Sequence, residues 1–179
     1  SFMIHPEGVS DTGTFSFLIV GDPGEGDASQ YVLHDQIVTN ASKEEVKFVV
    51  ISSDVVYPDG AMKDYEKNFW LPMKGVSKPV FAIPGNHDWY DALEGFAATF
   101  YDSASANKAM QARRAADLNI TAATNEKISM QIAEAARLRR EYRVPTGFQQ
   151  APFFQLQTKS EIKKGLDDTQ SAIGINQDL

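Results

Sequence analysis

The chain has 179 residues, of which 42% are apolar and 23% are charged, and these are the proportions of one ordinary globular domain. Its formal net charge of −7 argues against a nucleic-acid coat, because phosphate backbones bind to basic surfaces. The sequence contains no apolar stretch long enough to span a bilayer and no cysteine for disulfides or thiolate metal sites. It shows no secretory signal either, so the cytoplasm is the favoured location, although the sequence does not fix it.

Three short apolar runs, at residues 15–20, 46–52 and 78–84, are rich in β-branched and aromatic residues. Runs of this kind are typical of buried parallel strands. Residues 27–42 show helical periodicity with Asp27 as a good N-cap, and residues 61–74 carry aromatic residues at helical spacing. The order β-α-β-α-β predicts an α/β fold, in which flanking helices cover a layered parallel sheet.

Residues 92–145 differ in composition, since they are rich in alanine and arginine and have helical periodicity. Eight Lys/Arg and four Asp/Glu lie between Lys108 and Arg143, so this part carries a charge of about +4. It is either a solvated helical hairpin or a basic lid over an anionic substrate. A further strand is expected at residues 151–158, antiparallel or at an edge because a proline opens it. We therefore divide a single domain, residues 1–179, into a motif-bearing core (14–91), a helical insertion or lid (92–145), this strand and a polar tail (159–179).

Polar side chains follow each of the three predicted parallel strands. Asp22 comes after the first, Asp54 after the second, and Asn86 and His87 after the third. The carboxyl ends of parallel strands meet at one edge of the sheet, where α/β proteins bind ligands. Clustered carboxylates repel one another unless a cation neutralises them. Oxygen-rich sites suit hard cations such as Fe(III), Mn²⁺ or Mg²⁺, and two such ions about 3.5–4 Å apart can hydrolyse phosphate esters.

The motifs at the strand ends, GDPG at 21–24, SDVVY at 53–57 and GNHD at 85–88, resemble the first three motifs of calcineurin-like metallophosphoesterases. Within that superfamily they are most similar to the purple acid phosphatase pattern. The resemblance implies a dinuclear centre of Fe, Mn or Zn. In that centre Asp22 would bind the first ion, Asp54 would bridge both, Tyr57 would be a phenolate ligand to a ferric ion, and Asn86 would bind the second ion. Ser53 departs from the family pattern, which has glycine at this position.

The same resemblance implies two catalytic residues. His87 would stabilise the transferring phosphoryl group or protonate the leaving alcohol, and Asp88 would orient His87. The implied activity is metal-dependent hydrolysis of a phosphoester, with a phosphorylated small molecule as substrate. The next two residues, Trp89 and Tyr90, either wall the pocket or pack beneath the helical insertion, and packing is the preferred interpretation.

The histidines that complete the metal site in this family are missing. The chain has three histidines, and none follows His87. Only the N-terminal half of the family's sheet is recognisable as well. Two interpretations follow. The chain is part or a short form of a larger phosphoesterase, with a missing C-terminal half or an oligomeric partner. Alternatively, it is a non-catalytic binding or interaction domain on a phosphoesterase scaffold. A nucleotide-binding α/β domain is a weaker alternative, because no complete phosphate-loop motif is present.

Overall fold

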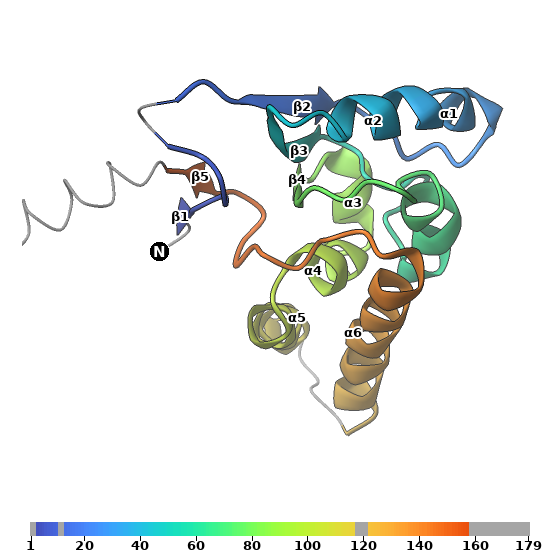
Figure 1. Cartoon of the computed structure of the whole chain (residues 1–179). Helices are drawn as coiled ribbons and strands as arrows, with labels where there is room; N and C mark the ends of the chain where they lie inside the picture. The colour runs from blue at the N-terminus through green and yellow to red at the C-terminus, as the bar shows by residue number, and fades with distance from the viewer. Residues whose placement is uncertain (1–2, 11–12, 117–121, 158–179) are drawn as a thin grey trace, which may run out of the picture.

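The structure, a computed structural model, describes residues 3–10, 13–116 and 122–157 (Figure 1). None of the helices in these ranges is long and apolar enough to cross a membrane. In chain order the elements are β1 (Met3–Ile4), β2 (Ser16–Val20), α1 (Ala28–Val32), α2 (His34–Ala41), β3 (Val46–Ser52), the 3-10 helix η1 (Met62–Asp64), the π-helix η2 (Glu66–Trp70), β4 (Val80–Ile83), α3 (Asn86–Tyr90), α4 (Glu94–Phe100), α5 (Ser103–Ala116), α6 (Ala122–Tyr142) and β5 (Gln155–Leu156).

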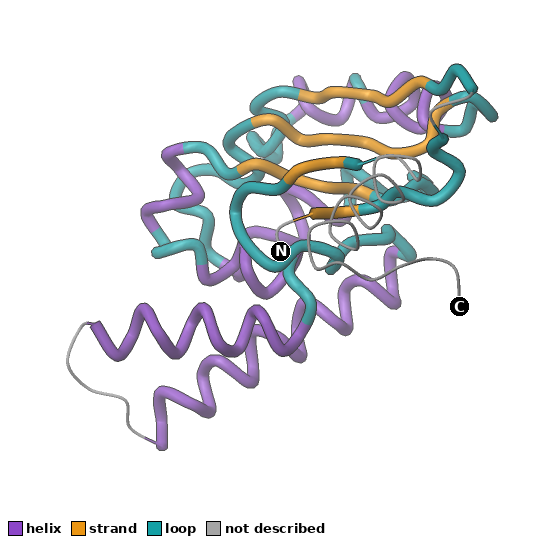
Figure 2. The backbone as a smooth tube through the Cα atoms, turned by 90° about the vertical axis from the view of Figure 1, so that its left-hand side faces the viewer, coloured by secondary structure: helices purple, strands orange, loops and turns teal. Residues whose placement is uncertain are grey.

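The three predicted strands form one parallel sheet in the order β2-β3-β4, which confirms the α/β prediction (Figure 2). Their carboxyl ends therefore meet at the same edge. The outer edge of β4 is occupied by the chain that follows α6. Pro145 accepts a hydrogen bond from the amide of Val80, and the Gln149 side chain both accepts from the Ala82 amide and donates to the Ala82 carbonyl, at 2.8 and 2.9 Å.

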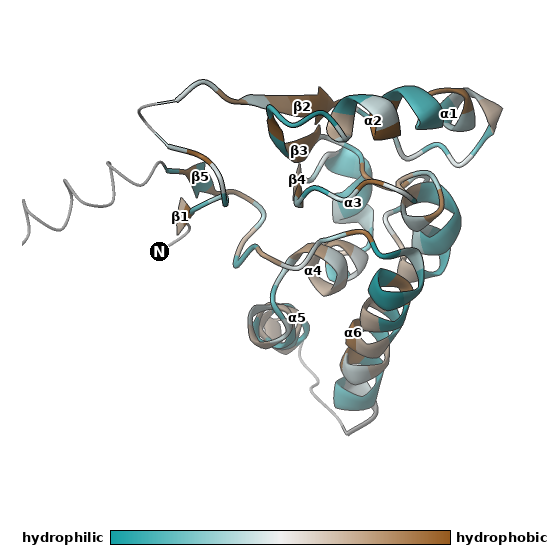
Figure 3. Ribbon diagram, in the orientation of Figure 1, coloured by the Kyte–Doolittle hydropathy of each residue, from teal (hydrophilic) through white to brown (hydrophobic). Residues whose placement is uncertain are grey.

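The strands β2 and β3 are made largely of hydrophobic residues, which are brown in Figure 3. Val49 and Ile51 of β3 belong to the main hydrophobic core, whereas Phe48 and Phe81 belong to a second, smaller cluster. Consecutive strand residues point to opposite faces, so the continuous apolar run in β3 fills both clusters. Segments near β1 and β5 contribute Val9, Phe154 and Leu156 to the second cluster.

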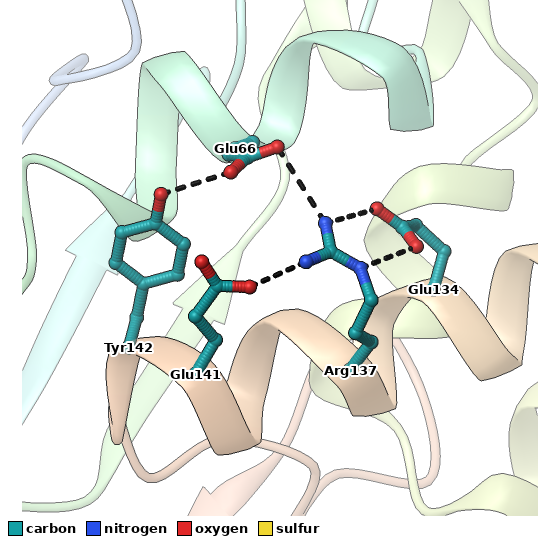
Figure 4. A network of polar contacts seen from close by, with 5 residues as sticks. All are labelled: Glu66, Glu134, Arg137, Glu141 and Tyr142. Carbon is teal, nitrogen blue, oxygen red and sulfur yellow. Dashed lines mark hydrogen bonds and ion pairs between the residues drawn. The ribbon is translucent and has the colours of Figure 1, made fainter.

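Helices α4, α5 and α6 lie together on one side of the sheet (Figure 1). Phe96, Phe100, Met110, Ile128 and Leu138 from these helices are fully buried in the main core. Their apolar stripes at helical spacing explain this packing, because such a stripe must be covered by another element. Several charged side chains of α6, among them Glu134, Arg137 and Glu141, lie at the surface and form ion pairs (Figure 4).

Two predicted helices are less regular than expected. Residues 27–42 start at the predicted cap, where Asp27 accepts a 2.9 Å hydrogen bond from the Ser29 amide, but the helix is interrupted at Leu33. Residues 61–74 form η1 and η2 instead of one α-helix. Tyr65, Phe69 and Trp70 are all fully buried, and the wider π turn accommodates these bulky neighbours against the core.

The predicted strand at 151–158 is corrected to the two-residue strand β5, which pairs in parallel with β1 and stands outside the three-stranded sheet. Of the two alternatives, antiparallel or at an edge, the second holds, because each strand of a two-stranded sheet is an edge strand. Since Pro145 and Gln149 already occupy the free edge of β4, the chain beyond them pairs with the N-terminal segment instead. The predicted polar tail, residues 159–179, lies outside the described residues.

Candidate functional site

The loops that follow β2, β3 and β4 pack directly against one another. Gly24 accepts a 2.9 Å hydrogen bond from the amide of Tyr57, which joins the first loop to the second. A Cβ atom at Gly24 would lie 2.2 Å from the carbonyl oxygen of Val55, and one at Gly85 would lie 2.0 Å from Asp54 Oδ1. Only glycine fits at these two positions, so the glycines of the motifs allow three strand ends to meet closely.

Asp54 is the centre of this junction. Its side chain is almost fully buried, and each carboxylate oxygen accepts one hydrogen bond. Oδ2 accepts from the Tyr57 hydroxyl at 2.9 Å, and Oδ1 accepts from the His87 backbone amide at 3.0 Å. Burial, followed by the hydrogen bond to Asp54, raises the pKa of Tyr57 above its ordinary value. The phenol is therefore protonated at neutral pH and donates to Asp54.

The His87 ring is held on three sides. Its Nδ1 lies 2.6 Å from the carbonyl oxygen of Pro58. A carbonyl can only accept, so Nδ1 carries the proton and Nε2 is left for other partners. The ring centroid lies 4.4 Å from that of Tyr57 and 5.1 Å from that of Tyr90. The imidazole is thus fixed in one orientation by a backbone acceptor and two aromatic rings.

Asp88 is fully buried, and its carboxylate is taken up by backbone amides. Oδ2 accepts from Val55 at 3.0 Å and from Gly85 at 2.9 Å, and Oδ1 accepts from Val56 at 3.3 Å. Burial raises the pKa of Asp88, and these amides partly offset that effect. Sequence reasoning assigned Asp88 to orient the His87 ring, whereas in the structure that ring is hydrogen-bonded to Pro58. Asp88 fixes the loops on which Asp54 and His87 stand.

Asn86 lies beside His87 at the start of α3 and is exposed. Its Nδ2 donates a 3.2 Å hydrogen bond to the Tyr90 hydroxyl. Trp89 and Tyr90 are 53% and 65% exposed, so neither is buried beneath the helices as the preferred interpretation expected. Trp89 lies beneath the guanidinium of Arg113 on α5, 5.6 Å from the ring centroid. Both aromatic residues therefore stand at the surface beside the candidate site.

The backbone around the site is in unusual conformations. Asp22, Ser53 and Asp54 all have positive φ, at 46°, 120° and 32°. Aspartate tolerates the left-handed region, whereas serine rarely adopts it. The φ of Ser53 gives a physical reason for the glycine that the family pattern has there. Strained backbone of this kind is found preferentially at functional sites.

Asp22 stands on the loop after β2, where it is exposed to solvent, and its charge contributes to the raised pKa of Tyr57. A cavity of about 160 Å³ lies beside it, which is enough for a benzene-sized group. Most of its lining is apolar: Val20, Pro23, Leu33, Ile37, Pro72 and Met73.

The donor types at this edge fit a hard cation, since Asp22, Asp54, Tyr57 and Asn86 all offer oxygen. Their arrangement does not form a complete set of metal ligands. Within residues 3–10, 13–116 and 122–157, no three His, Asp or Glu side chains are grouped so that they could hold a metal ion. The structure therefore brings Asp54, Tyr57, His87 and Asp88 into one cluster, with Asn86 adjoining it and Asp22 linked to it through charge.

Two contributors to this cluster are not among the predicted catalytic or metal-binding residues. Pro58 contributes its backbone carbonyl oxygen, which every residue type has, so its identity in the sequence does not predict this role. Tyr90 does have a signal, because Asn86 and Tyr90 are four residues apart, the spacing that brings side chains together on a helix.

The sequence pattern of calcineurin-like phosphoesterases matches residues 15–145, which is most of the chain. The chain belongs to this family. The match runs from β2 through α6, so it includes the loops that follow β2, β3 and β4 as well as the helices α4, α5 and α6. Members of the family typically bind two metal ions. Comparison with curated proteins and with solved structures finds no match.

Proposed function

We propose that this chain is a metal-dependent phosphoesterase of the purple acid phosphatase type, acting on a phosphorylated small molecule. The observation that supports it best is the shared carboxylate of Asp54, which joins the Tyr57 phenol and the His87 amide at the meeting point of two strand ends. Asp22, Asp54, Tyr57 and Asn86 would hold two ions of Fe, Mn or Zn. When bound, the ions supply the nucleophile and neutralise charge on the phosphoryl oxygens.

The protein's own residues then act on the leaving group. Because Pro58 holds the proton on Nδ1, the Nε2 atom of His87 is the one available to face the substrate. A protonated Nε2 donates a hydrogen bond to the phosphoryl oxygens or passes its proton to the departing alcohol. Asp88 acts indirectly, since it keeps the backbone at Val55 and Gly85 in place. The apolar cavity beside Asp22 has room for a ring-sized alcohol, which makes an aryl phosphate a suitable probe.

The test is hydrolysis of an aryl phosphate with Mn²⁺ or Fe³⁺ added, for the parent and the variants His87→Ala and Asp54→Asn. Both variants should lose at least about 100-fold in kcat/KM, the usual effect of removing an acid–base or metal-binding group. His5→Ala and Asp35→Asn are matched controls, because both residues are exposed and stand outside the cluster. Site variants that match the parent would refute the assignment.

A second candidate is a non-catalytic binding or interaction domain on the same scaffold. The observation that favours it is the lack of a three-residue His, Asp or Glu group able to hold a metal within the described ranges. Calorimetric titration with Mn²⁺, Zn²⁺ and phosphate separates the two candidates. Stoichiometric metal binding supports the enzyme, whereas phosphate binding without metal and without turnover supports the binding domain.

A further inference from the structure

Tyr90 touches two residues of the candidate site although it is not part of the core. Its side chain is 65% exposed, so its ring contributes little buried surface to folding. Its hydroxyl accepts the hydrogen bond from Asn86, and its ring stands edge-on to the His87 imidazole, with the two ring planes at 68°. Both contacts come from within α3, where Asn86 and Tyr90 stand one turn apart.

The hydrogen bond holds the Asn86 amide with its nitrogen toward Tyr90. An asparagine amide presents a donor nitrogen at one end and an acceptor oxygen at the other, and only the oxygen attracts a cation. Since Nδ2 donates to the Tyr90 hydroxyl, Oδ1 is turned away from Tyr90. Without the hydroxyl, this contact no longer restrains the exposed amide, which can then rotate. The phenol oxygen therefore holds Oδ1 on the side away from Tyr90, the orientation that the proposed metal site would use.

The ring contact restricts His87. The imidazole contacts the rings of both Tyr57 and Tyr90, with centroid distances of 4.4 and 5.1 Å. Tyr57 is held in turn by its hydrogen bond to Asp54. Tyr90 is the second aromatic contact, and it adds to the restriction on the imidazole. The hydroxyl and the ring of Tyr90 thus act on different residues.

We propose that Tyr90 is a positioning residue with two separable roles, its hydroxyl orienting Asn86 for metal binding and its ring orienting His87. This inference rests on the proposed metal-dependent function. The Tyr90→Phe variant removes the hydroxyl and keeps the ring, and the Tyr90→Leu variant removes both. Tyr31→Phe is the matched control, because the Tyr31 hydroxyl makes a comparable 2.8 Å hydrogen bond to the Lys67 carbonyl.

The experiment measures Mn²⁺ affinity by calorimetry, the side-chain amide resonances of Asn86 and the ring resonances of His87 by NMR, and the melting temperature. Tyr90→Phe should bind Mn²⁺ about three- to tenfold more weakly and shift the Asn86 amide resonances, while the His87 ring resonances stay in place. Tyr90→Leu should in addition move the His87 ring resonances, because the neighbouring aromatic ring is lost. Tyr31→Phe should match the parent in Mn²⁺ affinity and in these resonances.

Two outcomes would overturn the inference in distinguishable ways. If the parent binds Mn²⁺ and Tyr90→Phe binds it equally well with unchanged Asn86 resonances, Tyr90 does not orient Asn86, and the proposed function stands. If the parent binds no Mn²⁺ at all, the metal site itself is refuted, and the Tyr90 inference fails with it. Unchanged His87 resonances in Tyr90→Leu would refute the role of the ring.

Discussion

The buried carboxylate of Asp88 accepts hydrogen bonds from the amides of both Val55 and Gly85, and so ties the loop after β3 to the loop after β4. Asp54 stands in the first of these loops, and His87 follows the second at the start of α3. The carboxylate is desolvated and burial raises its pKa, an effect that the surrounding amides partly offset. Asp88 therefore helps to fix the relative position of the two loops.

Replacing Asp88 by alanine should lower the free energy of unfolding by about 3 kcal/mol, because buried amides would lose their acceptor. Urea denaturation measures this difference. Asp35→Ala is the control, since the Asp35 side chain is 98% exposed, and it should change stability far less. Equal effects of the two substitutions would contradict the structural role of Asp88.

Ser53 should be a site where glycine increases stability. Its φ of 120° lies in a region that glycine adopts freely and serine does not. Ser53→Gly should therefore raise the free energy of unfolding by about 1 kcal/mol. Ser52 is the matched control, because it is the neighbouring serine within β3, where glycine weakens a strand. Thermal melting should rise for Ser53→Gly and fall for Ser52→Gly, and the opposite order would show that Ser53 is unstrained.

Asp91 should make stability depend on pH between about 4 and 6. Burial raises its pKa to about 6, and nearby Glu94 and Asp59 add to the effect of burial. The folded protein therefore keeps a proton on Asp91 that the unfolded chain releases near pH 3.8, and its free energy of unfolding falls as the pH rises across this interval. Asp91→Asn cannot ionise and still accepts the hydrogen bond from the Gly95 amide.

We expect Asp91→Asn to gain stability relative to the parent as the pH rises from 4 to 7, with most of the gain between about pH 4 and 6. Urea denaturation of both proteins across this range measures the difference, which removes the contribution of other titrating groups. Parallel stability curves would show that Asp91 ionises normally in the folded protein.

Two arginines allow a comparison between a buried and an exposed ion pair. Arg114 makes a bidentate pair with Glu94, whose side chain is only 10% exposed, and Gln131 also donates to that carboxylate. Arg137 pairs at the surface with Glu134, Glu141 and Glu66 (Figure 4). Arg114→Met should cost about 2 kcal/mol, because it leaves a mostly buried carboxylate without its partner.

Arg137→Met should cost much less than Arg114→Met, and its effect should vanish in high salt, since solvent and ions screen exposed pairs. Chemical denaturation by urea at low and high ionic strength measures both effects. A larger loss for Arg137→Met would mean that the exposed network, which joins α6 to η2, contributes more to stability than its exposure indicates.

Much of the fold could be predicted from local sequence. The run in β3 contains consecutive apolar residues such as Phe48 and Val49, which is typical of a strand covered on both faces. The interruption at Leu33 could not be predicted, because it depends on tertiary contacts. The buried side chain of Gln30 bonds to the amide of Gly26 and to the carbonyl of Asn68, and the latter is 38 residues away in the chain.

The site was predictable to the extent that strand topology determines it. Asp54 and His87 follow neighbouring strands, so their proximity follows from the parallel order. The hydrogen-bond partners did not follow. The contact of His87 with Pro58 depends on the path of a loop, and the partners of Asp88 are backbone amides, which every residue type offers.

The side chain of Gln149 imitates a neighbouring strand along β4, since its amide meets both the N–H and the C=O of Ala82. Backbone groups of β4 that an added strand would need are therefore already hydrogen-bonded. A foreign peptide or another part of the polypeptide could extend the three-stranded sheet by β-augmentation only at the β2 side.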